Sequence, residues 1–233
     1  MNKKILTVVI IAVALCSSAY IYPTSFLLGK ASEIWVQRPS MNVIADIAVY
    51  DANGTDLKAT GKAEYAWNRQ SDLRVDYTVN TVKESVLYKN EGATKSNPAT
   101  LSGDRRHLIH NLFAALNKGK KAEGLLKEFG IDRKTSAFDR FEGQVCYIFG
   151  ATEGETDKPQ LWLEKDGMWP VKMQVFHGKE RIELRFSQWQ HPLMKGLFPR
   201  RIELYINNKL REVQTVSDIK TFVAQDPARF VSP

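Results

Sequence analysis

Alternation of apolar and polar residues predicts that most of this chain forms antiparallel strands. In the first half, Leu73, Val75 and Tyr77 recur at two-residue spacing, which places them on one face of a strand. In the second half, Arg181–Phe186 and Arg201–Ile206 alternate in the same way. Such strands have one apolar face and one wet face.

Short runs of turn-forming residues separate the predicted strands. Asp51-Ala-Asn-Gly54 provides the residues of a tight reversal, and Asn68-Arg69-Gln70-Ser71 provides another. Later turns are expected at Glu142-Gly143, Asp166-Gly167 and Asn207-Asn208. The strands are therefore expected to join as hairpins.

Helical spacing interrupts the strand pattern in two places. Before the strands, the segment 25–37 carries Phe26, Leu27, Ile34 and Trp35, which predicts one short amphipathic helix. The main helix is predicted near the middle of the chain, from Asp104 to Lys118, with apolar residues on one side. Its expected polar side carries Arg105, Arg106, Asn111 and Lys118. A shorter helix follows from Lys121 to Phe129 and ends at Gly130.

Together these elements predict a mainly β (α+β) protein, a long meander covered by one helical insertion. Sixteen apolar residues are expected on the covered sheet face or on the inner face of the helix. They are Leu73, Val75, Tyr77, Leu108, Leu112, Phe113, Leu116, Leu161, Leu163, Met173, Val175, Ile182, Leu184, Phe186, Ile202 and Leu204. They could form a filled core, which is normal for protein interiors, or line a ligand cavity in a strongly curved sheet. The residues alone favour the filled core.

The N-terminal segment has the pattern of a secretory signal peptide, and one domain is expected to follow it. Lys3 and Lys4 precede an apolar run, and the small residues Ser17 and Ala19 suit signal peptidase. We therefore expect a signal peptide over residues 1–19 and a mature periplasmic domain over residues 20–233, which is a length typical of one domain. The alternatives are an uncleaved anchor and a lipidated Cys16, although Leu15 does not suit lipidation.

The net charge narrows the class of partner, and the cysteine content indicates whether a disulfide can form. The formal net charge is +7, and loss of Lys3 and Lys4 would leave about +5. This excess fits an anionic membrane surface or a solvated basic face, and nucleic acid is not expected as a partner of an exported protein. Removal of Cys16 would leave only Cys146, so no internal disulfide is expected.

The sequence carries no recognisable catalytic motif, and neither a cofactor nor a metal is predicted. His107 and His110 lie three residues apart on the predicted helix, but only Asp104 is a nearby carboxylate. Glu183 and Glu203 sit among arginines and are interpreted as cross-strand ion pairs on a solvated face. We therefore expect a protein that is not an enzyme.

Three features of the first half are distinctive: the Asp51–Gly54 turn, Gly61 in a strand leading to Arg69, and Glu84-Ser-Val-Leu87 followed by Asn97-Pro98. The second half adds Gln160–Met173, Arg185–Trp189 and Phe198–Leu204. Together these features resemble the LolA/LolB-like periplasmic lipoprotein carriers.

The resemblance implies an open, strongly curved antiparallel half-barrel that binds acyl chains under a helical lid. It thereby favours the cavity over the filled core. It also implies that Arg69 gates the cavity, but Gln70 replaces the usual proline here and an exposed turn arginine is an equal alternative.

The function expected from this resemblance is reversible transfer of a lipoprotein's acyl chains, or of a lipid, across the envelope. An inner-membrane donor and an outer-membrane acceptor would be its protein partners. The apolar loop Gln188–Pro199 either folds into the core or makes transient membrane contact. The alternative function is a regulatory or interaction module on the same fold with a filled core.

Overall fold

The computed structural model describes residues 22–68, 72–89, 92–95, 105–117 and 121–231. The predicted signal segment 1–19 and Arg69 lie outside these ranges. None of the described helices is long and apolar enough to cross a membrane.

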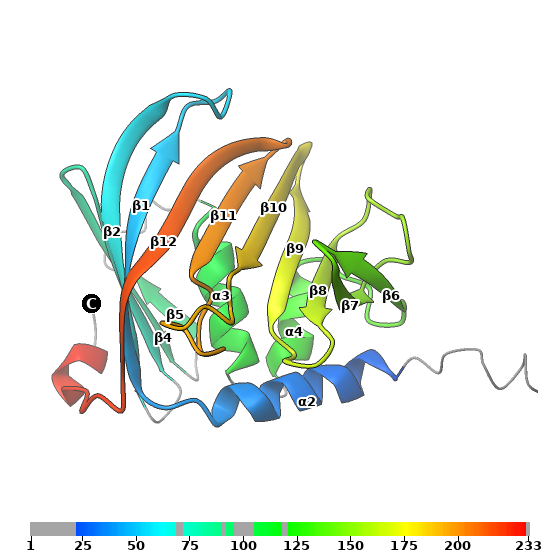
Figure 1. The fold of residues 1–233 in the computed structure, drawn as a ribbon, viewed down its shortest axis with the longest axis horizontal. Coiled ribbons are helices and arrows are strands. Elements are labelled where there is room, and N and C mark those ends of the chain that lie inside the picture. Colours follow the sequence, from blue (N-terminus) through cyan, green and yellow to red (C-terminus); the bar gives the residue numbers. More distant parts are fainter. Residues whose placement is uncertain (1–21, 69–71, 90–91, 96–104, 118–120, 232–233) are drawn as a thin grey trace, which may run out of the picture.

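The described strands form one antiparallel sheet that is open at both ends (Figure 1). The order is β5-β4-β3-β2-β1-β12-β11-β10-β9-β8-β7-β6, so β1 joins the two halves by pairing with β12. The strands are β1 (Met41–Tyr50), β2 (Leu57–Trp67), β3 (Leu73–Val79), β4 (Val82–Lys89), β5 (Gly92–Lys95), β6 (Ser136–Phe141), β7 (Gln144–Phe149), β8 (Gln160–Glu164), β9 (Pro170–His177), β10 (Glu180–Ser187), β11 (Arg201–Ile206) and β12 (Lys209–Thr221). The strong curvature of this sheet gives the predicted open half-barrel.

The helical insertion connects the two ends of the sheet. Helices α3 (His107–Leu116) and α4 (Lys121–Glu128) follow β5 and precede β6, and they lie against the concave face. Helix α2 (Thr24–Val36) runs below the strands, and the 3-10 helix η1 (Pro227–Phe230) lies beside the first half of the sheet (Figure 1). One chain segment can therefore cover the interior of the half-barrel without crossing the sheet.

The predicted apolar face of the first helix is wrong in part. Leu27 and Trp35 are buried as expected, but Phe26 and Ile34 are exposed, at 53% and 36%. Four-residue steps from Leu27 lead to Ala31 and Trp35, and these positions together with Leu28 face the core.

The main helix is shorter than predicted. It begins at His107, with Arg106 as its N-cap, and it ends at Leu116. Arg105 and Arg106 were expected on its solvent side, yet both are mostly buried because they pair with carboxylates on the strands.

The loop Gln188–Pro199 folds into the core, so the predicted membrane contact through this loop has little apolar surface to use. Trp189, Met194 and Phe198 are nearly fully buried, whereas Leu193 is 38% exposed. The indole nitrogen of Trp189 donates a hydrogen bond to the Pro170 carbonyl oxygen at 3.0 Å, which fixes the loop against β9.

The solvated face predicted around Glu183 is also a partial error. Glu183 is only 3% exposed, and its carboxylate contacts Arg181 at 2.6 Å, Arg185 at 2.7 Å and Lys172 at 3.8 Å. Burial alone would raise its pKa, but these three cations outweigh that effect and the pKa is lowered. The apolar stems of the basic side chains cover the carboxylate on the convex face.

Candidate functional site: the concave face and its mouth

The concave face of the sheet and the inner face of α3 form one continuous apolar layer. All sixteen predicted lining residues lie in the same buried cluster, and each is at most 5% exposed. The structure therefore brings the whole predicted set together. Their role in binding a ligand stays a prediction.

Phe113 joins α3 to three other parts of this layer. Its ring lies 5.5 Å from that of Trp35, 5.4 Å from Phe186 and 5.2 Å from Phe198, measured between centroids. These contacts join α3 to α2, to β10 and to the loop before β11. In this conformation the side chains of α3 occupy the interior of the half-barrel.

A buried polar network connects the start of α3 to the sheet. Arg106 Nε donates to Glu212 Oε2 at 2.5 Å, Gln214 Nε2 donates to Glu212 Oε1 at 2.9 Å, and the Tyr65 hydroxyl donates to Gln214 Oε1 at 2.5 Å. On the other side, Arg105 Nη2 pairs with Glu180 Oε2 at 2.8 Å. Two adjacent arginines thus hold the N-terminal end of α3 to β12 and β10.

His110 does not have the surroundings of a metal ligand. Its ring is hydrogen-bonded to the Tyr77 hydroxyl and is also close to the rings of Tyr65 and Tyr88. Within the described ranges, no group of three or more histidine, cysteine, aspartate or glutamate side chains could hold a metal ion.

A pocket of about 500 Å³ opens on the concave side at the N-terminal end of α3. Its apolar wall is made by Val49, Val79, Val82, Leu204 and Ile206. Its charged side chains are Glu84, Arg105, Arg106, Arg211 and Glu212. We call these residues, with Asn80 and Thr81, the mouth pocket. It joins an apolar wall to a charged rim, as sites for amphiphilic molecules do.

Three charged groups of the mouth pocket differ from the rest. Glu84 is 6% exposed, and its Oε2 atom is buried with no hydrogen-bond partner among the described residues. Arg211 forms no ion pair within the described part of the chain, whereas Arg105 and Arg106 are both paired. The Nε atom of Arg105 is also buried with no hydrogen-bond partner among the described residues, although its Nη2 atom is paired. The pocket therefore offers one acidic group and two basic groups to a ligand.

The sequence interpretation missed these charged residues, although alternation could have placed Glu84. In β4, Glu84 shares its two-residue spacing with the buried Val86 and Tyr88, so it must face the concave side. Arg211 could not be placed in this way. It is the extra residue of a bulge, because Leu204 pairs with Glu212 whereas Tyr205 pairs with Leu210.

The predicted gating residue, Arg69, lies outside the described residues, and its role stays a prediction.

A wider depression of about 870 Å³ crosses the sheet where Asp46, Lys62 and Thr78 alternate with the concave side chains. None of its described lining residues has a buried polar side-chain atom without a partner. It is therefore a weaker candidate than the mouth pocket.

Comparison with known proteins identifies the fold. No family model and no curated protein sequence matches the chain. Among solved structures, it is similar to a LolA superfamily protein from Nitrosomonas europaea, with a TM-score of 0.57 and 15% identity over 91% of this chain and 99% of that one. It is also similar to an outer membrane lipoprotein-sorting protein domain from Vibrio parahaemolyticus, with a TM-score of 0.55 and 10% identity over 89% and 95% of the two chains.

A DUF1329 family protein from Desulfovibrio piger has the same fold, with a TM-score of 0.52 and 13% identity over 89% of this chain and 95% of that one. These similarities define a LolA-like fold, which confirms the fold predicted from the sequence. At such low identity they establish the fold alone, so the activity of this chain has to be argued from its own residues.

Proposed function

We propose that the protein is a non-enzymatic periplasmic carrier that reversibly binds the acyl chains of a lipoprotein or lipid. The observation that carries this proposal is the apolar layer between the concave sheet face and α3, which opens at the mouth pocket. The similar LolA superfamily and lipoprotein-sorting structures support it at the level of the fold. An inner-membrane donor and an outer-membrane acceptor would be its partners.

Ligand entry in this proposal requires α3 to move away from the sheet. The lining side chains are almost fully buried, so an acyl chain would have to replace the contacts that α3 makes, including those of Phe113. Burial of an acyl chain contributes about 0.8 kcal/mol per methylene, so a long chain can offset the loss of these contacts. The polar contacts at Arg105 and Arg106 would retain the N-terminal end of α3 as a hinge.

The first test is to identify what the protein carries. We expect native mass spectrometry of protein purified gently from its envelope, followed by lipid extraction, to reveal an acylated molecule. Its absence, together with no binding of a fluorescent fatty acid by the purified protein, would contradict the carrier proposal.

The second test is Leu112→Glu, compared with Asn111→Glu on the same helix. Leu112 is 1% exposed and faces the sheet, whereas Asn111 is half-buried on the other side. A buried carboxylate without a partner costs several kcal/mol. We expect folded Leu112→Glu to lose fatty-acid binding and Asn111→Glu to retain it. A folded Leu112→Glu variant with unchanged binding would contradict a lid role for α3.

The alternative is an interaction or regulatory module with a filled core. The near-complete burial of the concave side chains favours it, because no lining residue needs a ligand to cover it. In that case Leu112→Glu unfolds the protein, and the wild-type protein is detected only as the bare polypeptide.

A further inference from the structure

The mouth pocket contains a buried carboxyl oxygen that lacks a partner. Glu84 is 94% buried and lines the pocket, and its Oε2 atom accepts no hydrogen bond from any described residue. Buried polar atoms nearly always have a partner, because the loss of hydration is otherwise uncompensated. The missing donor is therefore expected on a molecule that enters the pocket.

A bulge in β12 brings a basic side chain to the same pocket. Arg211 lies between the residues that pair with Leu204 and Tyr205, so it has no cross-strand partner of its own. Bulges re-aim side chains and are common beside binding sites. Here the bulge allows Arg211 and the adjacent Glu212 to line the pocket together.

The other charged side chains of the pocket already have ion-pair partners, although the Nε atom of Arg105 is buried with no partner among the described residues. Arg105 pairs with Glu180 and Arg106 pairs with Glu212. This leaves the carboxylate of Glu84 and the guanidinium of Arg211, which forms no ion pair among the described residues and interacts with Glu180 only at longer range. A ligand that satisfies both must carry a hydrogen-bond donor and a negative group, and a charged ammonium is a stronger donor to a carboxylate than a hydroxyl.

We propose that the mouth pocket binds the head group of a zwitterionic membrane amphiphile that carries a primary ammonium and a phosphate, as in phosphatidylethanolamine. The ammonium donates to Glu84, and the phosphate accepts from Arg211, whose planar guanidinium suits a phosphate. The acyl chain extends from Val79 and Leu204 of the apolar wall towards α3. This inference rests on the proposed carrier function and specifies its ligand.

Three lysophospholipids with one acyl chain and different head groups test the proposal directly. Each is used to displace a fluorescent fatty acid from the wild-type protein. The ethanolamine lipid should bind about tenfold more tightly than the choline lipid, whose quaternary ammonium cannot donate a hydrogen bond. It should also bind more tightly than the glycerol lipid, which has no cation.

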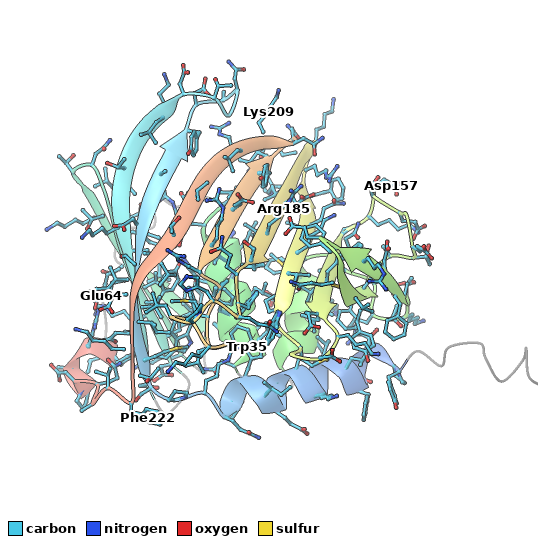
Figure 2. The ribbon with its side chains drawn as sticks, viewed as in Figure 1. Trp35, Glu64, Asp157, Arg185, Lys209 and Phe222 are labelled. Atoms are coloured by element: carbon cyan, nitrogen blue, oxygen red, sulfur yellow. The ribbon has the colours of Figure 1, made fainter. Side chains whose placement is uncertain are left out.

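Two variants assign the preference to residues. Glu84→Gln should remove the preference for ethanolamine over choline, because the amide is no longer a charged acceptor. Arg211→Gln should weaken binding of the ethanolamine and glycerol lipids alike. Lys209→Gln is the matched control, because Lys209 is exposed at the tip of the same hairpin and does not line the pocket (Figure 2).

The outcomes separate this inference from the carrier proposal. If the fatty acid binds but the three lysophospholipids bind equally, or if Glu84→Gln keeps the ethanolamine preference, the head-group site is wrong and the carrier proposal stands. If the wild-type protein binds neither the fatty acid nor any lysophospholipid, both are wrong. If a variant fails to fold, the comparison of the three lysophospholipids on the wild-type protein still tests the head-group site.

Discussion

Phe113 shows how a single residue holds the lid of this fold. It is fully buried, and its ring contacts rings from α2, β2, β10 and the loop before β11. Phe113 is the only phenylalanine, tyrosine or tryptophan within α3 as the structure describes it. The stability of the lid should therefore depend strongly on this side chain.

We expect Phe113→Ala to lower the free energy of unfolding by about 3–5 kcal/mol, because it removes buried apolar surface and leaves a cavity. Phe176→Ala is the control, since Phe176 is 39% exposed on β9 and should cost much less. Equilibrium unfolding in urea measures both. A loss below about 1 kcal/mol for Phe113→Ala would show that α3 is not packed on the sheet in solution.

At the scale of elements, the sequence was most informative where burial follows a regular period. The strand faces around Leu73 and Ile182 were predictable because a period of two leaves no choice of face. The first helix was placed correctly, but its face was not. Phe26 is as apolar as Leu27, and only the position of the sheet decides which of them is buried.

The charged parts of the candidate site were much harder to predict. Arg105 and Arg106 look like solvent-facing residues because their partners, Glu180 and Glu212, are distant in the sequence. Arg211 is placed by a bulge, and no local pattern marks its position. Ion pairs between residues that are distant in the sequence can be predicted only when the register of the sheet is known, and only the structure provides that register.

The C-terminal segment is a second element that joins distant parts of the fold. Arg229 pairs with Glu64 at 2.8 Å and with Asp76 at 3.2 Å, and Phe230 packs with Ala66 and Leu87. Figure 2 shows Glu64 beside this segment. Its short 3-10 helix is capped by Asp226, whose carboxylate accepts from the Ala228 amide. The convex side of β2–β4 is thus covered by the end of the chain.

We expect Phe230→Ala to destabilise the protein by about 2–3 kcal/mol, because Phe230 is 4% exposed and its ring would be lost from a small cluster. Val231→Ala is the neighbouring control, since Val231 is 71% exposed and should have almost no effect. Thermal and urea unfolding compare the two. Equal stability of Phe230→Ala and wild type would mean that the segment does not dock on β2–β4 in solution.

For the whole molecule, the two faces of the sheet differ in how they are stabilised. The concave face is an apolar layer with a few tyrosines, whereas the convex face of β9–β11 carries ion pairs around Glu183 and Glu203. Arg185, labelled in Figure 2, joins these pairs and lies 4.6 Å from the ring of Tyr205. Apolar burial fixes the shape of the interior, and ion pairs cover the convex face of β9–β11.

The concave tyrosines give the molecule a predictable response to alkaline pH. Burial raises the phenol pKa of Tyr65, Tyr77 and Tyr88 above the ordinary value near 10. In the unfolded chain these phenols ionise near pH 10, but in the folded protein they stay protonated to higher pH. The stabilising effect is therefore complete below pH 10 and is lost as the pH rises towards the folded pKa.

We expect the free energy of unfolding to fall between pH 8 and pH 11, by up to about 1.4 kcal/mol per pH unit above 10 for each of these tyrosines. Tyr88→Phe tests the cause, because the Tyr88 hydroxyl is buried with no hydrogen-bond partner among the described residues. This variant should be at least as stable as wild type at pH 8 and should lose less stability at pH 11. Urea unfolding at the two pH values measures the stability, and absorbance at 295 nm follows phenol ionisation. An identical pH dependence in the variant and wild type would contradict the burial of Tyr88, and with it the packing of β4 beneath the lid.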